Sequence, residues 1–571
     1  MNPLSRRTFL QGAATLAGAL AVPPFVASCA AQNAALGAPV LTPEEAAQIA
    51  RGVVFLDADK SGKRAPNAKG LAGVRVSNGR DVVVTDAQGR YQLPIGEQGA
   101  IFVVKPSSYR VPLNAHNLPQ HFYLHRPNGT PIQTKYAGIA PTGPLPASID
   151  FPLIAHAEPD DFRVLLFGDP QPRNLKEVDY VARDVVADLV GVEAAFGLSL
   201  GDNAFDNLDV LEPLNEVTAQ IGVPWHVVVG NHDLNFEAPD NRFASETFQR
   251  IYGPTYYSFD YGKTHFVVTD NVQWLGKGNG YTGAWGARQL EWLANDLKAV
   301  PRDQLVVVLM HIPLVVLEEE RGAGKPGELN EGGRFNTAER ERFLQILSEH
   351  PRTMSVSGHT HVQYHAYLGR EEGWTGAGKH HHFNCGTVSG SWWRGAPDEQ
   401  GIPHTLMRDG TPNGTAFLNC KGGEYDIEWR VARRPADYQM NVYAPARLKK
   451  GDVGAVEINV FNGSMQTKVE MRWNGGDWHQ VARVPGRDPG FAALKQIEES
   501  LPAFEPGGVK APWRPLPGKY KTSHLWKMEL PNDLKAGANL IEVRARDTGN
   551  RVFSERRIVR VADDADDVDE V

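Results

Sequence analysis

Five short loops carry residues whose side chains could bind metal ions. The first loop, Gly168-Asp169-Pro170-Gln171, follows an apolar run at residues 163–167 that has the length of a buried strand. The other four, each also after an apolar run, are Gly201-Asp202-Asn203, Gly230-Asn231-His232-Asp233, His311 and Gly358-His359-Thr360-His361. Because an α/β sheet places its active site at the carboxyl ends of its strands, we expect these loops to converge. Carboxylate, amide and imidazole groups are ligands of Zn, Fe and Mn ions.

The segments around these loops predict an α/β core from residue 162 onward. Apolar residues recur with helical spacing over residues 178–189, 211–221, 289–293 and 339–347, and residues 256–261 and 265–269 have the pattern of a hairpin. Strand-like runs therefore alternate with helix-like runs, which is typical of an α/β fold.

In this order, the five loops resemble the calcineurin-like metallophosphoesterase family, whose pattern is D-x-H, G-D, G-N-H-[DE], H and G-H-x-H. The resemblance covers residues 161–390 and implies a four-layer α/β/β/α sandwich with two divalent metal ions between the sheet edges. Carried over motif by motif, the ligands of one ion would be Asp169, Gln171, Asp202 and His361. Those of the other would be Asp202, Asn231, His311 and His359, so that Asp202 bridges both.

The resemblance also assigns two residues to catalysis. His232 follows a ligand without being one in the family pattern, and it would protonate the leaving oxygen. Asp233 would accept a hydrogen bond from His232 and fix its tautomer. A two-metal centre of this kind activates water and clamps the oxygens of a phosphoryl group, so we expect a phosphoric-ester hydrolase, either a phosphodiesterase or a phosphomonoesterase.

Gln171 departs from the commoner family pattern, which has histidine at this position. A glutamine can bind a metal through its amide oxygen, and it would make the first site rich in oxygen ligands. Harder ions, Mn²⁺ or Mg²⁺, are then favoured there over Zn²⁺. For the other ion, the ligand types do not distinguish Mn, Fe and Zn.

Trp392, Trp393 and Arg394 follow the last loop in a Ser-Trp-Trp-Arg run. Two aromatic rings and a guanidinium beside a metal centre would bind a phosphate ester with an organic group. Equally, the two tryptophans would bury the junction with the next domain. The sequence leaves these alternatives open.

The N-terminus has the features of a signal peptide over residues 1–31. Ser5-Arg6-Arg7-Thr8-Phe9-Leu10 resembles the twin-arginine export motif, and an uncharged apolar stretch follows at residues 12–27. We therefore expect export to the periplasm. Val26-Ala27-Ser28-Cys29 resembles a lipobox, which would attach the protein to a membrane through a lipid on Cys29; simple cleavage near Ala30 is the alternative.

The regions flanking the core predict further domains. A linker at residues 32–48 leads to a small immunoglobulin-like β-sandwich over 49–105 and an irregular bridge over 106–160. Residues 57–62 are a polar turn or, less favoured, a calcium loop. A C-terminal β-sandwich-like domain is expected over 391–561, and an acidic tail over 562–571. This arrangement resembles an exported bacterial branch of the metallophosphoesterases.

Composition narrows the classes of function. The 571 residues carry a net charge of -8, which disfavours nonspecific nucleic-acid binding. The family resemblance implies a small phosphate ester as the partner. Three cysteines exclude a disulfide scaffold, and whether Cys385 pairs with Cys420 stays open. Two other classes remain: a noncatalytic cell-envelope binding protein with a structural metal core, and a metal-dependent hydrolase of substrates without phosphorus. The natural substrate and oligomeric state are open.

Overall fold

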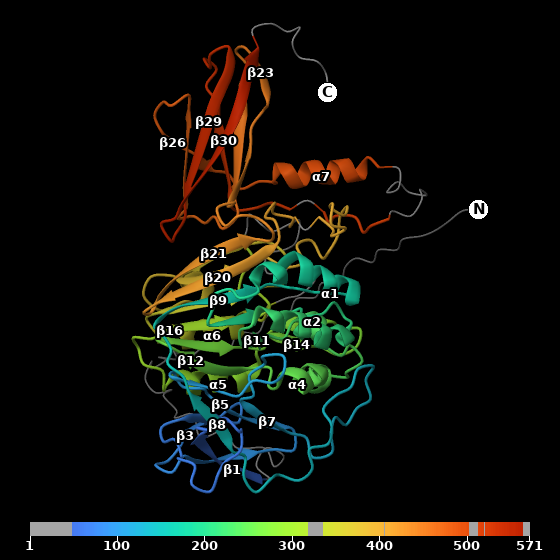
Figure 1. The fold of residues 1–571 in the computed structure, drawn as a ribbon, viewed down its shortest axis with the longest axis vertical. Coiled ribbons are helices and arrows are strands. Elements are labelled where there is room, and N and C mark those ends of the chain that lie inside the picture. The colour runs from blue at the N-terminus through green and yellow to red at the C-terminus, as the bar shows by residue number, and fades with distance from the viewer. Residues whose placement is uncertain (1–47, 318–334, 405, 502–511, 519, 563–571) are drawn as a thin grey trace, which may run out of the picture. The chain divides into compact units, whose positions relative to one another are not determined.

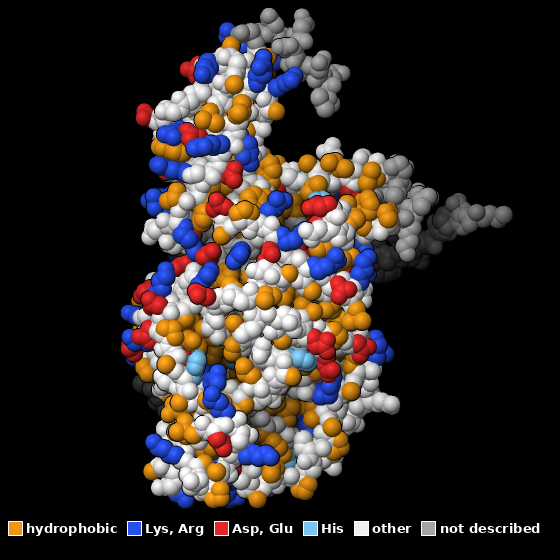
Figure 2. Space-filling view, in the orientation of Figure 1, with side chains coloured by type: hydrophobic (Ala, Val, Ile, Leu, Met, Phe, Trp, Pro, Cys, Tyr) orange, Lys and Arg blue, Asp and Glu red, His pale blue; other side chains and the backbone are white. Residues whose placement is uncertain are grey.

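The computed structural model describes residues 48–317, 335–404, 406–501, 512–518 and 520–562 (Figure 1). The predicted signal peptide with Cys29, nearly all of the linker and the acidic tail lie outside these ranges, so they remain predictions. Within the described ranges, no helix combines the length and apolar character needed to cross a membrane. Basic and acidic side chains are interspersed on the face shown in Figure 2.

Two mixed β-sheets form the centre of the fold. The five-stranded sheet has the order β11-β10-β9-β20-β21, with bounds Trp225–Val227, Phe196–Ser199, Asp161–Phe167, Gly414–Lys421 and Glu424–Val431. The six-stranded sheet has the order β12-β13-β16-β17-β19-β18, with bounds Tyr257–Tyr261, Thr264–Val268, Leu305–Leu309, Thr353–Ser357, His380–Asn384 and Tyr364–Leu368. β9, β10 and β11 are parallel to one another, as are β13, β16, β17 and β19. Parallel strands within a sheet end at one edge, where the expected loops begin.

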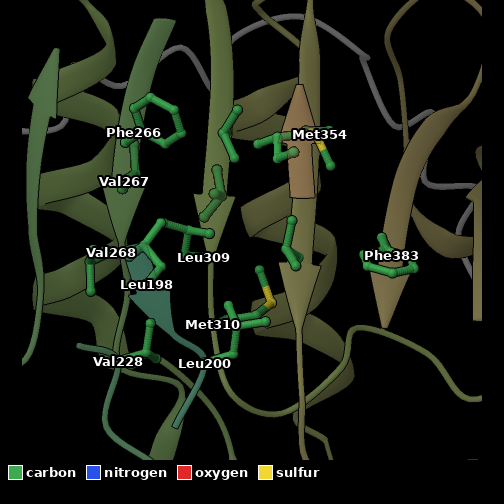
Figure 3. Close-up of a cluster of buried hydrophobic side chains, with 14 of the residues drawn as sticks. Leu198, Leu200, Val228, Phe266, Val267, Val268, Leu309, Met310, Met354 and Phe383 are labelled. Carbon is green, nitrogen blue, oxygen red and sulfur yellow. The ribbon is translucent and has the colours of Figure 1, made fainter. Parts of the chain in front are cut away.

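Strand alternation explains how the layers pack. In β9, Val164 and Leu166 enter the core between the sheets, whereas Leu165 and Phe167 face helices α1 (Leu175–Val181) and α2 (Leu211–Thr218). Helices α5 (Gly286–Leu297) and α6 (Thr337–Leu347) pack against the six-stranded sheet. Figure 3 shows Leu198 of the first sheet in one cluster with Val268 and Leu309 of the second. The predicted four-layer α/β/β/α sandwich is confirmed.

The expected helices are present with small differences. α1 continues through a π-helical turn (Ala182–Val186) and a 3-10 turn (Ala187–Leu189), and α2 through Ala219–Ile221. β12 and β13 form the expected hairpin. The remaining short elements of this domain are α3 (Asn241–Ala244), α4 (Glu246–Tyr252), β14 (Val272–Trp274), β15 (Tyr281–Gly283) and 3-10 turns at Leu208–Val210, Asn231–Asp233 and Arg370–Glu372.

The N-terminal domain is larger than the sequence indicates. Its two four-stranded sheets have the orders β4-β1-β8-β6 and β3-β2-β5-β7. The bounds of β1 to β8 are Gln48–Leu56, Arg75–Ser77, Val82–Val84, Arg90–Ile95, Gly99–Val103, Tyr109–Arg110, Phe122–His125 and Phe151–Ala155. β6, β7 and β8 lie within residues 106–160, so the irregular bridge predicted there is wrong. These strands are short and pair with distant partners, β1 with β8 for example, and local periodicity does not reveal such pairing.

The boundary at residue 390 also needs correction. β20 and β21 lie in the predicted C-terminal domain, yet β20 pairs antiparallel with β9 and completes the central sheet. The C-terminal sandwich then consists of sheets β22-β24-β28-β27 and β23-β30-β29-β25-β26. Its strands β22 to β30 span Met440–Tyr443, Arg447–Lys449, Ala455–Val460, Lys468–Trp473, His479–Gln480, Ala482–Arg483, Leu525–Glu529, Gly537–Arg546 and Val552–Ala562, and helix α7 spans Pro489–Glu499.

A buried charge cluster joins the N-terminal and central domains. Arg75 of β2 contacts Asp260 at 2.8 Å and Asp296 at 3.3 Å. His265 lies between the same two carboxylates, at 2.7 and 2.9 Å. Burial alone would lower the pKa of His265, but the carboxylates raise it above its ordinary value. The imidazolium and guanidinium together neutralise two buried carboxylates.

Two further features concern the cysteines and the turn at residues 57–62. Cys385 and Cys420 are buried free thiols, so the disulfide is absent from this structure. In the turn at residues 57–62, the Asp57 carboxylate accepts hydrogen bonds from the backbone amides of Ser61 and Gly62 at 3.1 and 2.9 Å. These bonds are those of a polar turn. The calcium loop stays a prediction.

Candidate metal centre

The five loops meet at one edge of the two sheets. The ligand atoms of Asp202, His311 and His359 all lie within 4.8 Å of one another, and all three residues are buried. The Oδ1 atom of Asn231 is 3.0 Å from Nε2 of His311, which is 3.3 Å from Oδ1 of Asp202. The structure thus brings together the four residues expected to hold the second ion.

The four residues expected around the first ion also adjoin one another. The Nε2 atom of His361 lies 3.7 Å from Oδ1 of Asp169, and the amide of Gln171 donates to Oδ2 of Asp202 at 2.9 Å. In the described part of the chain, Oε1 of Gln171 and Nε2 of His361 are buried without a hydrogen-bond partner. A buried acceptor without a partner costs about 1–3 kcal/mol. A cation would satisfy both atoms, so these residues fit a metal site.

Hydrogen bonds to backbone carbonyls orient two of the imidazoles. His311 Nδ1 donates to the carbonyl of Leu200 and His361 Nδ1 to that of Gly390, both at 2.8 Å. A carbonyl can only accept, so each Nδ1 carries a proton and each Nε2 is the atom that faces the carboxylates of the centre. A second-shell bond of this kind fixes the orientation of a metal-binding histidine.

Burial sets the protonation of the histidines. It lowers the pKa of His359 to about 3 and that of His361 well below its ordinary value, so both rings are neutral. Burial acts the same way on His311, but the adjacent Asp202 carboxylate raises the pKa of His311 to about 9. Without a metal, a proton on His311 therefore compensates the charge of Asp202. A cation would take its place.

The pKa values of the Asp169 and Asp202 carboxyl groups move in opposite directions. Burial raises the pKa of Asp169 to about 8, and the neighbouring Asp202 adds to this rise. Burial also opposes ionisation of Asp202, but the positive charge of His311 outweighs it and lowers the pKa of Asp202. Two buried carboxylates side by side need positive charge to ionise together. Divalent cations supply it, which is a second reason that the site fits them.

The loop backbone is strained where the ligands lie. Five ligand residues have positive φ: Asp169 (38°), Gln171 (46°), Asp202 (48°), His359 (79°) and His361 (53°). For residues other than glycine this conformation costs about 1–3 kcal/mol each and is concentrated at functional sites. Gly201, with φ of 93°, precedes Asp202, and a Cβ there would lie 2.4 Å from Nδ1 of His311. The glycines of the motifs therefore make room for ligands.

A polar ladder supports the loop of His359 and His361. Along β17 and β19, hydrogen bonds connect His380, Ser355, His382, Ser357 and Asn384 in that order, at 2.8–3.0 Å. Asn384 then donates to Oγ1 of Thr360 at 2.7 Å. The histidine-rich segment is a strand that positions the ligand loop.

His232 lies at the opening of the centre with its side chain 18% exposed. Its Nδ1 is 2.5 Å from Oδ1 of Asp206, and its ring stacks on Phe205 with centroids 4.4 Å apart. Its backbone N–H donates to Oδ1 of Asp202 at 2.9 Å. The Nε2 atom is 4.0 Å from Oδ2 of Asp202, next to the metal-binding groups.

Asp233 has a different role from the one predicted. Its carboxylate accepts hydrogen bonds from the backbone of Gly230 and Ala204 at 2.8 and 2.9 Å, and from the side chain of Asn203 at 2.9 Å. It is fully buried and holds two ligand loops together. The residue that binds His232 Nδ1 is Asp206, which the sequence analysis missed although it is the first carboxylate after the Gly201-Asp202-Asn203 loop.

The residues of the Ser-Trp-Trp-Arg run differ in position, so substrate contact and burial in the core apply to different members. Trp392 stacks on His361 with centroids 4.0 Å apart, and the guanidinium of Arg394 lies 5.5 Å from the Trp392 ring. Trp393 is buried, donates from Nε1 to the carbonyl of Pro170 at 2.9 Å and packs beside Tyr180. Trp392 and Arg394 thus adjoin the centre, whereas Trp393 belongs to the core.

Three protein-family models match successive parts of the chain. The model described as "Calcineurin-like phosphoesterase" matches residues 162–363. The model of the N terminal of calcineurin-like phosphoesterase matches residues 58–137, and that of the C terminal matches residues 382–553. None of the curated proteins compared with the chain matches it.

Similar solved structures include a purple acid phosphatase from yellow lupin seeds, at 13% identity and a TM-score of 0.30 over 86% of this chain and 70% of that one. Another is a superoxide reductase from Ignicoccus hospitalis, at 15% identity and a TM-score of 0.12 over 22% of this chain and 80% of that one. Likenesses this weak establish nothing about this chain.

Proposed function

Because this chain belongs to the calcineurin-like phosphoesterase family and is a phosphoester hydrolase, we propose that it is an exported enzyme that hydrolyses small phosphoric esters with two divalent metal ions. The observation that carries the site assignment is the pair of buried, unpartnered acceptors, Gln171 Oε1 and His361 Nε2, beside two carboxylates. One ion would be held by Asp169, Gln171, Asp202 and His361, the other by Asp202, Asn231, His311 and His359.

When bound, the two cations lower the pKa of a water molecule and neutralise charge on the phosphoryl oxygens. His232 supplies the proton for the departing oxygen. Asp206 binds its Nδ1, so Nε2 is the atom that faces the reaction. In the overall reaction, the water oxygen bonds to phosphorus, the ester P–O bond breaks, and the leaving oxygen takes a proton.

The test uses protein stripped of metal and reloaded with Mn²⁺, Zn²⁺ or Fe²⁺. We expect turnover of p-nitrophenyl phosphate or of bis-p-nitrophenyl phosphate; a faster diester rate identifies a phosphodiesterase, a faster monoester rate a phosphatase. Asp202→Ala should abolish both rates, since it removes the bridging carboxylate, while Asp437→Ala, at an exposed position, should change neither. Failure to hydrolyse either ester with any metal would contradict the proposal.

Metal identity follows from the ligands of the first site. Asp169, Gln171 and Asp202 offer oxygen and only His361 offers nitrogen, which favours Mn²⁺. Gln171→His should shift the metal content of protein loaded from an equimolar mixture toward Zn²⁺, measured by elemental analysis. An unchanged Mn-to-Zn ratio would show that Gln171 does not select the ion.

Export is proposed from Arg6 and Arg7, and membrane attachment from Cys29. With the full chain expressed in a bacterial host, we expect activity in the periplasmic or membrane fraction, and replacement of both arginines by lysine should retain it in the cytoplasm. Cys29→Ala should release membrane-bound protein without stopping export. Activity that stays cytoplasmic in the unaltered chain would refute export.

A further inference from the structure

Four arginines gather around Trp392 at the edge of the metal centre. The Nη1 atom of Arg173 donates to the carbonyl of Trp392 at 2.8 Å. The guanidiniums of Arg394 and Arg408 lie 5.5 and 5.3 Å from the Trp392 ring. Arg514 joins them through Glu177, which lies 4.0 Å from its Nη1 and also contacts Arg173. We call these four residues the arginine cluster.

Two guanidiniums of the arginine cluster share a single carboxylate. Glu177 lies 3.3 Å from Arg173 and 4.0 Å from Arg514, so one carboxylate serves two guanidiniums. Among the residues that the structure describes, Arg408 forms no ion pair.

Two N–H groups of the cluster are buried without an acceptor. In the described part of the chain, neither Nη2 of Arg173 nor Nε of Arg408 has a hydrogen-bond partner. Hydrogen bonds to charged groups contribute more than neutral ones, so an unpaired guanidinium N–H is costly. An anion within reach of either group would accept a hydrogen bond from it.

The cluster is continuous with the groups that would act on the substrate. Arg408 Nη2 donates to the carbonyl of Thr360, between the ligands His359 and His361, at 2.9 Å. The guanidinium of Arg173 lies 4.0 Å from the ring of Phe205, which in turn stacks on His232. An anion bound by the cluster would lie beside a phosphoryl group bound by the metal ions.

We propose that the substrate carries a second phosphoryl group, which the arginine cluster binds while the metal centre acts on the first. This rests on the proposed function. The guanidinium fork matches the oxygens of phosphate in two parallel hydrogen bonds, and several arginines together favour a group of more than one negative charge. Phosphoanhydrides and bisphosphorylated metabolites share this chemistry.

The test compares matched substrates on the Mn²⁺-loaded full chain. AMP and ADP differ by an anhydride-linked phosphoryl group, and glucose 6-phosphate and glucose 1,6-bisphosphate by a separate ester. We expect kcat/KM to be at least about tenfold higher for one doubly phosphorylated member than for its partner. A preference for ADP over AMP identifies a phosphoanhydride substrate. A preference for glucose 1,6-bisphosphate over glucose 6-phosphate identifies a bisphosphate.

Variants connect the preference to the cluster. Arg514 is 52% exposed at its side chain, so Arg514→Gln should fold, and it should lower kcat/KM for the preferred substrate by about 10- to 100-fold, more than for the singly phosphorylated partner. Arg556→Gln, whose side chain is 75% exposed in the C-terminal domain, is the matched control. Equal kcat/KM within both pairs, or equal losses for both members in Arg514→Gln, would overturn the proposal.

A binding measurement separates this proposal from the proposed function. Methylenediphosphonate and methylphosphonate differ in the second phosphoryl group, and neither requires turnover. Calorimetry on the Mn²⁺-loaded protein should give at least about tenfold tighter binding of the diphosphonate, and Arg514→Gln should reduce that difference. An inactive protein that retains the difference would refute the hydrolase but not the subsite; equal affinities would refute the subsite.

Discussion

Replacing Asp206 with asparagine tests whether this carboxylate positions His232. Asp206→Asn keeps the side chain's shape and removes its charge, so it weakens the 2.5 Å contact with His232 Nδ1. A hydrogen bond to a charged group contributes about 1.5–3 kcal/mol, and solvent screening at a side chain 41% exposed reduces this to about 1–2 kcal/mol. Because 1.4 kcal/mol is a factor of ten, kcat should fall by about 5- to 30-fold.

The assay is the pH dependence of kcat and KM on the better p-nitrophenyl ester, with the metal content of each variant measured alongside. Loss of the carboxylate makes protonated His232 less stable, so the alkaline limb of the kcat profile should move to lower pH while KM changes little. Asp233→Asn is the contrasting variant. It should lower the unfolding midpoint, because Asp233 accepts three buried hydrogen bonds.

The reasoning fails if Asp206→Asn leaves both kcat and the alkaline limb unchanged. It also fails if Asp233→Asn moves the alkaline limb with unaltered stability, since Asp233 would then be the partner of the catalytic histidine.

Three further predictions concern the buried cluster between domains and the loop glycines. Arg75→Met should lower the free energy of unfolding by about 3–5 kcal/mol in urea titrations, because two buried carboxylates lose a cation; a loss below about 1 kcal/mol would contradict this. The folded pKa of His265 is raised, so its stabilising contribution is complete below pH about 6.5 and disappears as the pH rises through the folded pKa; His265→Gln should remove this decline at pH values above about 6.5. Gly201→Ala should lower the amount of bound metal measured by elemental analysis, because its Cβ would collide with His311. The control is Gly191→Ala, which has a similar φ and open space around it and should cost only about 1–2 kcal/mol of stability. Equal metal content in the two variants would disprove the steric argument.

The order of the five loops could be predicted from the sequence because each loop is a local pattern. An apolar run marks a strand, and a glycine followed by Asp169, Asp202, Asn231 or His359 marks its end. Parallel strands place these ends at one sheet edge, so convergence follows from alternation of strands and helices alone. The main helices were predictable for the same reason, whereas the four-layer sandwich was implied by the resemblance to the metallophosphoesterases.

Only the tertiary structure decided which groups surround the ligands. The sequence indicated the adjacent Asp233 as the partner of His232, but the path of the loop after β10 places Asp206 there. Arg173, Arg408 and Arg514 share no sequence pattern, because Arg173 precedes Trp392 by 219 residues and Arg514 follows it by 122. β20 completes the central sheet by pairing with β9 across a similar separation. Long-range contacts of this kind depend on the packing of whole domains, which local periodicity and motif spacing do not encode.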